Sequence, residues 1–363
     1  MTAPAKLLGI GEAVPWFRAR SLNGPQNYSF DIAGGRPVLM LLFGSAAQPA
    51  CAQALARVLA DRDMFDDIRA SFYGVTIDPS DEAERRIALE LPGIRYFLDY
   101  DRAVSRALGA ADSAGAYRPH WLLLDRTLRV MARFALEDTD TAINAFKGVV
   151  DRPAAPDWAP VAMVPDIIER DLCRQLIDLY ERQGGTASGV MREIDGKTTP
   201  VLDAAFKVRS DYLIPPGPLA EQLIARLFHR LSPMIRRCFQ FEATQVERLI
   251  VGCYDSAEGG HFRAHRDDTT KGTAHRRFAV TINLNAEDYE GGDLRFPEFG
   301  QRTYRAPTGG AVVFSCSLLH QATPVTQGRR YALLPFLYDE AGARIRDENS
   351  SFLAAPTPES VGA

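Results

Sequence analysis

A proline-rich stretch divides this chain into two halves whose hydrophobic patterns differ. Residues 151–160 read Asp-Arg-Pro-Ala-Ala-Pro-Asp-Trp-Ala-Pro. Proline fixes the backbone angle φ and removes a hydrogen-bond donor, which favours an extended and poorly paired segment. The chain has 363 residues, which is long for one domain, since domains commonly hold about 100–200 residues. We therefore expect domains at residues 1–150 and 164–345, a linker at 151–163 and a flexible tail at 346–363.

The first half alternates between strand-like and helix-like segments. Residues 37–43 form a continuous apolar run, as expected for a strand that is buried on both faces. Residues 51–59 follow with apolar side chains at helical spacing, and residues 71–77 are again β-branched and aromatic. Strands and helices that alternate at this length predict an open α/β sheet.

Four short motifs in this half resemble peroxiredoxins and related thioredoxin-like redoxins. They are Gly11 to Phe17, the strand ending at Phe43 with Cys51 beyond it, Gly74 to Asp78, and Arg118 to Trp121. The resemblance implies a thioredoxin-like α/β fold for the first domain.

Cys51 and Arg118 are the candidate redox residues that this resemblance implies. Cys51 stands at the start of a predicted helix, where the helix dipole favours a thiolate. The proline and the Thr or Ser that shape the family's pocket are replaced by Gly44 and Gln48, and this half has no second cysteine to resolve a sulfenic acid. Two interpretations follow: a redoxin scaffold with an inert cysteine, or a one-cysteine thiol peroxidase with the second half as a sensor or binding module.

Helical periodicity opens the second half, and strand periodicity closes it. Apolar stripes at residues 167–180 and 219–235 predict two helices that face a core. Further along, short β-rich segments are separated by turn residues such as Gly291 and Gly292. Helices followed by short strands predict a double-stranded β-helix, or jelly roll, with supporting helices. The whole chain is therefore expected to be a multi-domain α+β protein.

Two histidines and an aspartate in the second half have the spacing of a metal site. His265 and Asp267 are separated by one residue, so at a strand end they point the same way while Arg266 faces elsewhere. His320 lies on a later segment, and only folding of the strands between could bring it to the pair. Two imidazoles and one carboxylate that leave coordination positions open suit a non-haem Fe(II) site.

Several further motifs, in the same order, resemble the Fe(II)/2-oxoglutarate dioxygenases of the prolyl 4-hydroxylase type. The matching segments are Tyr254 before the His-x-Asp pair, Arg277 to Asn285, Glu290 to Phe296, Pro307 to Phe314, and His320 to Arg330. The resemblance implies that His265, Asp267 and His320 bind Fe(II).

The same resemblance implies which residues bind 2-oxoglutarate. Arg330 would pair with the far carboxylate of this co-substrate, because a guanidinium group suits a carboxylate bidentately. Tyr254 would donate its hydroxyl to the same carboxylate. Thr281 or Asn283 is expected to line the pocket.

The implied reaction is oxidative decarboxylation of 2-oxoglutarate by O₂ to succinate and CO₂, coupled to hydroxylation of a second substrate. Ascorbate dependence is typical of the family. The second substrate stays open between peptidyl proline, a free amino acid and a small metabolite, and its specificity is expected to lie in loops such as residues 185–208. A non-catalytic oxygen or iron sensor is a competing interpretation.

Charge, hydropathy and cysteine content limit which partners and which compartment we expect for the protein. A net charge of −4 gives no reason to expect a nucleic-acid or anionic-membrane partner. No apolar run approaches the roughly 18 residues that span a bilayer, and Met1 to Lys6 lack the apolar core of a signal peptide. The five cysteines are scattered and form no CxxC pair, which favours a reducing compartment. We expect a cytoplasmic protein, with its oligomeric state left open.

Overall fold

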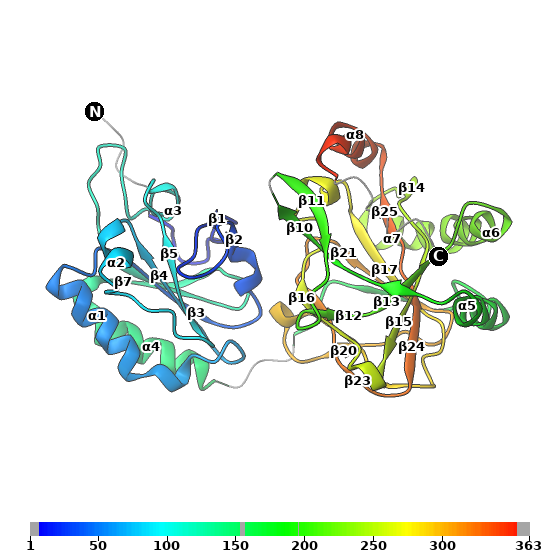
Figure 1. Cartoon of the computed structure of the whole chain (residues 1–363), viewed down its shortest axis with the longest axis horizontal. Coiled ribbons are helices and arrows are strands. Elements are labelled where there is room, and N and C mark those ends of the chain that lie inside the picture. Colours follow the sequence, from blue (N-terminus) through cyan, green and yellow to red (C-terminus); the bar gives the residue numbers. More distant parts are fainter. Residues whose placement is uncertain (1–6, 153–156, 195, 354–363) are drawn as a thin grey trace. The chain divides into compact units, whose positions relative to one another are not determined.

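The chain forms two compact units (Figure 1). The computed structural model describes residues 7–152, 157–194 and 196–353. Unit 1 comprises the residues up to Asp157 together with Pro297–Gly300, and unit 2 comprises Trp158–Phe296 and the residues from Gln301 onward. Parts of the predicted linker, residues 153–156, and of the predicted tail, residues 354–363, lie outside the described residues.

Regular structure reaches further than the predicted domain limits at both ends of the second domain. The last residues of the predicted linker belong to β8 (Ala162–Val164), which pairs with β21 (Ala311–Ser315). The predicted tail begins inside α8 (Glu340–Glu348), which a 3-10 turn at Ser350–Phe352 follows. Neither β8 nor α8 carries a long apolar stripe, so the hydrophobic pattern of the sequence does not predict these two elements.

Unit 1 is a five-stranded mixed sheet in the spatial order β5-β4-β3-β6-β7. The strands are β3 (Val38–Gly44), β4 (Ser71–Thr76), β5 (Ile94–Leu98), β6 (His120–Leu124) and β7 (Val130–Ala135). The first three are parallel, and β6 and β7 are antiparallel to their neighbours. The other elements are α1 (Pro49–Ala60), α2 (Pro79–Ala83), α3 (Ala103–Ala107), α4 (Thr139–Val150) and the pair β1 (Arg18–Ala19) and β2 (Tyr28–Ser29). The predicted open α/β sheet is confirmed.

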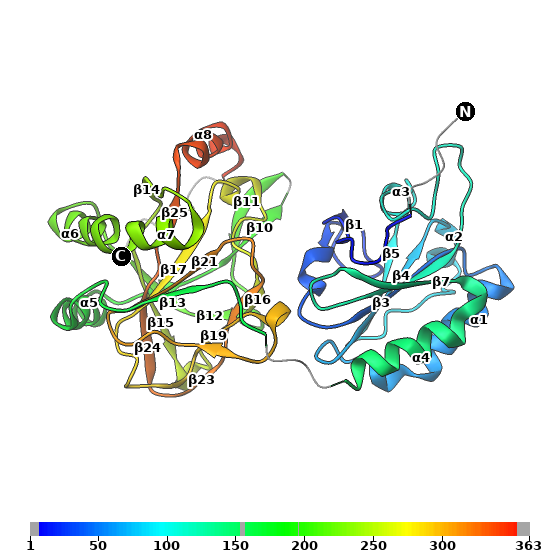
Figure 2. The same cartoon turned by 180° about the vertical axis from the view of Figure 1, so that it is seen from behind.

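The central strand of unit 1 is buried on both faces, as its apolar run predicts. Leu39 and Leu41 pack with residues of α1 and α4, and the alternate residues Met40 and Leu42 enter the core on the other face. The two helices run side by side along one face of the sheet in both views (Figure 2).

Unit 2 contains two antiparallel sheets of a jelly roll. The larger sheet has the strand order β14-β25-β17-β24-β15-β13-β9, and β21 pairs with β17 and with β8 beside it. The strands of this sheet not yet given are β9 (Thr186–Ala187), β13 (Ser210–Leu213), β14 (Gln245–Val246), β15 (Ile250–Asp255), β17 (Phe278–Asn283), β24 (Arg329–Leu333) and β25 (Phe336–Tyr338). The smaller sheet runs β12 (Lys207–Val208), β16 (His261–His265), β22 (His320–Ala322), β19 (Leu294–Arg295) and β20 (Thr303–Tyr304). Two short pairs join β10 (Val190–Ile194) with β11 (Lys197–Val201) and β18 (Glu290–Gly291) with β23 (Val325–Gln327). Residues 185–208, which we expected to be loops, therefore hold several short strands.

Helices cover the outer face of the larger sheet (Figure 1). They are α5 (Arg170–Gln183), and α6 (Pro218–Arg226) continued by a π turn at Leu227–Leu231 and by α7 (Ser232–Phe239). Val251 and Cys253 of β15 pack in this helix-side core, so the alternate residues Gly252 and Tyr254 face the opposite way. Tyr254 packs instead with residues around the smaller sheet. The interior between the two sheets is therefore where the predicted site residues gather. No helix among the described residues is long and apolar enough to cross a membrane.

Candidate metal centre

Two strands of the smaller sheet bring the predicted metal ligands together. β16 and β22 are antiparallel, and their register sets His265 directly opposite His320, with ring centroids 4.2 Å apart. Asp267 follows β16, and its amide N–H donates to the Cys316 carbonyl at 2.9 Å. The ligand atoms of the three side chains all lie within 4.8 Å of one another, in the one such group found among the described residues.

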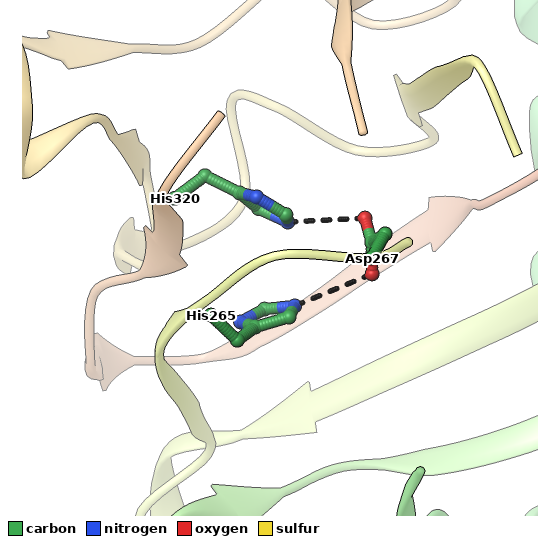
Figure 3. A group of neighbouring side chains, drawn as sticks. All are labelled: His265, Asp267 and His320. Atoms are coloured by element: carbon green, nitrogen blue, oxygen red, sulfur yellow. Dashed lines mark ion pairs between the residues drawn. The ribbon is translucent and has the colours of Figure 1, made fainter. Parts of the chain in front are cut away.

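Both imidazoles point toward the Asp267 carboxylate (Figure 3). His265 Nε2 lies 3.5 Å from one carboxylate oxygen, and His320 Nε2 lies 3.3 Å from the other. The Nδ1 atoms lie 2.7 Å and 2.9 Å from the carbonyls of Arg263 and Leu318 respectively. A carbonyl can only accept, so each Nδ1 carries the proton and each Nε2 offers a lone pair.

His265 and Asp267 are in the protonation states that a divalent metal needs. Burial, followed by the neighbouring His320, lowers the pKa of His265 to about 4, so this imidazole is neutral at neutral pH. Burial alone would raise the pKa of Asp267, but His320 and His265 outweigh it and hold that pKa well below its usual range. Neutral imidazole and ionised carboxylate are the ligating forms, and two nitrogens with one oxygen suit Fe(II) with open positions.

Aromatic rings enclose the two imidazoles. Phe262 stacks on His265, with centroids 3.5 Å apart and an interplanar angle of 18°. Phe314 and Phe296 contact His320 at centroid distances of 4.6 Å and 6.3 Å. These contacts and the Nδ1 hydrogen bonds together hold both rings in place.

Arg330 is a buried guanidinium group without a carboxylate partner among the described residues. It is 2% exposed, and its Nε and Nη1 are buried and make no hydrogen bond. β24 sets it opposite Tyr254, whose ring centroid lies 5.0 Å from its Cζ. Gly292 (φ +64°) leaves room for it, since a Cβ there would lie 3.1 Å from Arg330 Cδ. A buried unpaired guanidinium is costly, and a carboxylate ligand would satisfy it bidentately.

The other predicted cofactor and pocket residues face the same interior. The buried Tyr254 hydroxyl accepts a hydrogen bond from Arg209 Nη1 at 3.3 Å. Thr281 and Asn283 are two residues apart on β17 and face the same way, whereas their neighbour Ile282 packs in the helix-side core. Asn283 is tied to the backbone by its amide, which donates to Ala306 O at 2.7 Å.

Sequence reasoning missed a charged cluster that enters this interior from β12 and β13. Arg209 makes two hydrogen bonds to Asp211, at 2.6 Å and 2.7 Å. It lies against Gly252, where a Cβ would approach Arg209 Cδ to 3.2 Å. Lys207 is buried, and its Nζ lies 4.7 Å from the centroid of Phe262. Lys207, Arg209 and Asp211 alternate at strand spacing, which is the sequence signal that could have found them.

A second missed group supports the backbone of Asp267, a predicted metal ligand. Glu247 accepts hydrogen bonds from Arg276 Nε at 2.6 Å and Nη2 at 2.7 Å, and His275 Nε2 lies 3.0 Å from it. Arg276 Nη1 donates to Asp267 O at 3.3 Å. Burial would raise the pKa of Glu247, but Arg276 and His275 hold it well below its usual range.

The surroundings of Cys51, the candidate redox cysteine of unit 1, disfavour a reactive thiolate. Cys51 is fully buried at the start of α1, and its thiol donates to Phe43 O at 3.0 Å. Burial raises the pKa of Cys51, which opposes the thiolate that a helix start would favour and fits the interpretation of an inert cysteine. Arg118 is exposed, and the side-chain partner of the Cys51 thiol is Gln48, at 3.9 Å.

Curated relatives align with part of this chain. A PKHD-type hydroxylase of Synechococcus sp. (strain JA-2-3B'a(2-13)) is 29% identical over 153 residues, which are 40% of this chain and 66% of the relative. A PKHD-type hydroxylase of Pseudomonas fluorescens is 34% identical over 151 residues, 38% of this chain and 64% of the relative. The chain thus spans just under two thirds of the length of these two relatives.

Solved structures of two prolyl hydroxylases also match. A prolyl-4-hydroxylase of Pseudomonas putida is 19% identical and covers 50% of this chain and 93% of its own, with a TM-score of 0.39. A prolyl hydroxylase of Trichoplax adhaerens, in complex with a hypoxia inducible factor peptide, is 16% identical and covers 52% of this chain and 86% of its own, with a TM-score of 0.40.

Family models match one segment in each unit. Residues 249–338 match the 2OG-Fe(II) oxygenase superfamily, and this segment holds the metal-ligand group with Tyr254 and Arg330. Residues 10–133 match the AhpC/TSA family. The chain therefore carries a 2OG-Fe(II) oxygenase domain in its C-terminal unit and an AhpC/TSA domain, of thioredoxin-like fold, in its N-terminal unit.

Proposed function

We propose that unit 2 is a 2-oxoglutarate-dependent Fe(II) dioxygenase that hydroxylates a small-molecule or peptidyl substrate and releases succinate and CO₂. The observation that carries this proposal is the convergence of two imidazole Nε2 atoms on the Asp267 carboxylate, with both Nδ1 atoms committed to backbone carbonyls. The relatives named PKHD-type hydroxylases support it.

Two sets of residues would bind the metal and the co-substrate separately. His265, Asp267 and His320 would hold Fe(II), while Arg330 and Tyr254 would hold the far carboxylate of 2-oxoglutarate. When bound, the iron and 2-oxoglutarate supply the oxidising chemistry with O₂, and ascorbate is proposed as the reductant that keeps the iron ferrous. The chain's own task is to keep the ligands neutral or ionised as required, to fix their rings and to exclude water.

A thiol peroxidase centred on Cys51 is a weaker proposal. The peroxidatic reaction needs an accessible thiolate, whereas this thiol is fully buried and its pKa is raised. Unit 1 is therefore proposed as a scaffold or docking domain.

Succinate formation tests the proposed activity. The full chain is supplied with Fe(II), 2-oxoglutarate and ascorbate, and succinate is measured with and without O₂. We expect O₂-dependent succinate in the wild type and its loss in His265→Ala and Asp267→Ala. His261→Ala is the matched control, because His261 lies on the same strand and outside the ligand group.

The same assay separates an enzyme from a sensor. A wild-type protein that binds iron and 2-oxoglutarate but forms no succinate in air would contradict the catalytic proposal and leave a sensor. Succinate formation that survives in His265→Ala would instead contradict the assigned ligands.

A further inference from the structure

Ion pairs within the protein account for most of the charged groups in the jelly-roll interior. Arg209 pairs with Asp211 at two points, 2.6 Å and 2.7 Å. Arg276 pairs with Glu247 in the same way, at 2.6 Å and 2.7 Å. The carboxylate of Asp267 and the guanidinium of Arg330 are the groups proposed to bind iron and 2-oxoglutarate. Lys207 and Arg248 are two further basic side chains among the described residues of this interior.

Lys207 is the first of these cations. The residue is 7% exposed, and its ammonium group has no carboxylate partner among the described residues. Nζ donates to Ser188 Oγ at 2.6 Å and to Gly189 O at 3.0 Å, which are both uncharged acceptors, so one of its three donors remains. Burial, followed by the positive charge of Arg209, lowers the pKa of Lys207 to about 6. The carboxylates of Asp211 and Asp267 raise this pKa but do not outweigh the burial, so an anion bound to Nζ would favour the protonated form.

Arg248 is the second cation. Its side chain is 32% exposed, but Nε is buried and makes no hydrogen bond. The carboxylate oxygen within ion-pair range, Glu247 Oε1, is 3.9 Å away and already accepts from Arg276. The guanidinium instead lies over the ring of Phe336, 5.2 Å from its centroid. Burial and the charge of Arg276 lower the pKa of Arg248 to about 10.

Both side chains are linked to the proposed iron site by ring contacts. Arg248 lies over the ring of Phe336, which Arg276 also covers at 4.0 Å from its centroid, and Arg276 donates to Asp267 O. β12 pairs with β16 so that Lys207 stands opposite Phe262, and Phe262 stacks on His265. The positive charge of Arg248 lowers the pKa of Lys207, and the negative charge of Asp267 raises it. A ligand group held by these cations would therefore lie beside the metal.

We propose that the substrate hydroxylated by this dioxygenase carries a carboxylate, and that Lys207 and Arg248 bind it. The proposal rests on the proposed function and deepens it by naming the substrate class. A carboxylate would give both cations the charged acceptor that they lack, through charge-assisted hydrogen bonds. An uncharged prolyl residue within a peptide offers no such group, so the site favours an acid over the corresponding amide.

Matched pairs of acids and amides test this charge recognition. The probes are the common L-amino acids and their carboxamides, such as L-proline with L-prolinamide, added to full-length protein loaded anaerobically with Fe(II) and 2-oxoglutarate. Binding is measured by calorimetry, and succinate formation is measured after O₂ is admitted. We expect at least one acid to bind about tenfold or more tightly than its amide and to accelerate succinate formation.

Variants of the two cations identify the groups responsible. We expect Lys207→Met and Arg248→Gln to weaken acid binding by about tenfold or more and to leave amide binding unchanged, and Lys207→Arg to restore acid binding. The matched control is Lys271→Met, because Lys271 Nζ also lies over a ring, 3.9 Å from the centroid of Phe352. A lysine that only anchors Ser188 and Gly189 would, when replaced, weaken acid and amide alike.

Each other outcome decides against the proposal. Amides that bind as tightly as their acids, a panel in which no acid binds, or variants that keep the acid preference would overturn it. Failure of the proposed function is distinct, because the wild type would then bind no iron and 2-oxoglutarate, which the loading step reports before any probe is added.

Discussion

Arg330 is the residue whose surroundings point most directly to a missing anion. Its guanidinium is buried, two of its nitrogens have no hydrogen-bond acceptor, and the aromatic ring of Tyr254 lies on one side of it. Its neighbour Arg329 is exposed and pairs with Asp255 at 2.7 Å. Adjacent arginines on one strand thus have opposite environments, and only the inward one lacks a partner.

We predict that Arg330→Ala weakens 2-oxoglutarate binding and retains iron. Loss of hydrogen bonds between charged groups costs about 1.5–3 kcal/mol, which is about 10- to 150-fold in Kd. The Kd for 2-oxoglutarate is measured by anaerobic titration of 2-oxoglutarate into the iron-loaded protein. Arg329→Ala is the control on the same strand and should bind 2-oxoglutarate like the wild type. Equal affinities in the two variants would contradict the role of Arg330.

Cys51 should behave as a buried core residue. The thiol is protonated at neutral pH because burial raises its pKa, whereas Cys238 is the exposed cysteine of the five. We predict that iodoacetamide labels Cys238 and spares Cys51 in the native protein, as mass spectrometry would show. We also predict that peroxide consumption is the same in wild type and Cys51→Ser. Rapid labelling of Cys51, or peroxide consumption that depends on it, would support the peroxidase interpretation instead.

At the scale of elements, strand register determines the metal centre. His265 and Asp267 could be paired from their spacing, but His320 reaches them because β16 and β22 align the two histidines. The loop after Asp267 is held by the ion pair of Glu247 and Arg276, which ties it to the segment before β15.

We predict that Glu247→Gln loosens Asp267 and weakens iron binding by about tenfold or more, since partners of metal ligands commonly contribute that much. Breaking a buried ion pair should also cost about 3–5 kcal/mol of stability at neutral pH. Iron affinity is measured by anaerobic competition with a chelator, and stability by thermal melting. Glu340→Gln is the control, because Glu340 is an exposed carboxylate that accepts from Thr244 and Gln245.

The stability difference between wild type and Glu247→Gln should depend on pH. The pKa of Glu247 is lowered in the folded state, so its stabilising contribution is complete above the unfolded value of about 4.5. It is lost as the pH falls below that value toward the lower folded pKa. The two melting temperatures should therefore converge below pH of about 4, and a constant difference would contradict the ion-pair account.

Hydrophobic periodicity in the sequence was sufficient to predict most of the fold. The family motifs predicted the three candidate ligands that the structure brings together. The apolar run of β3 and the stripes of α5 and α6 are strong signals because burial dictates them. Arg248 could not be found in the same way, because a charged residue in an irregular segment reads as solvent-exposed. Lys207 shows only its alternation with Arg209 and Asp211, and its burial depends on the pairing of β12 with β16. Of the two interpretations of Cys51, its burial favours the inert cysteine, because the sequence shows the helix dipole but does not show the desolvation that opposes a thiolate.

At the scale of the whole molecule, all proposed ligand groups belong to unit 2. The metal-ligand group, Tyr254 and Arg330 fall within the 249–338 family match, and unit 1 carries the separate 10–133 match. Unit 1 therefore needs no metal or 2-oxoglutarate to complete its core.

We predict that Fe(II) and 2-oxoglutarate protect only unit 2 from hydrogen exchange. Peptides that cover β15 to β17 and β22 to β24 should exchange more slowly in the loaded protein, because bound ligands stabilise the elements that hold them. Peptides that cover β3 to β7 should not change. The measurement is hydrogen-exchange mass spectrometry of the full chain, with His265→Ala as control. Protection in β3 to β7 would contradict the confinement of the site to unit 2.

The central claim is that His265, Asp267 and His320 hold an iron to which 2-oxoglutarate binds. The most direct measurement is an anaerobic titration of Fe(II) and 2-oxoglutarate into the full chain, followed by visible absorption. We predict a weak charge-transfer band that saturates with one iron per chain in the wild type and is absent from His265→Ala and Asp267→Ala. A wild type without the band, or a band undiminished in both variants, would contradict the account.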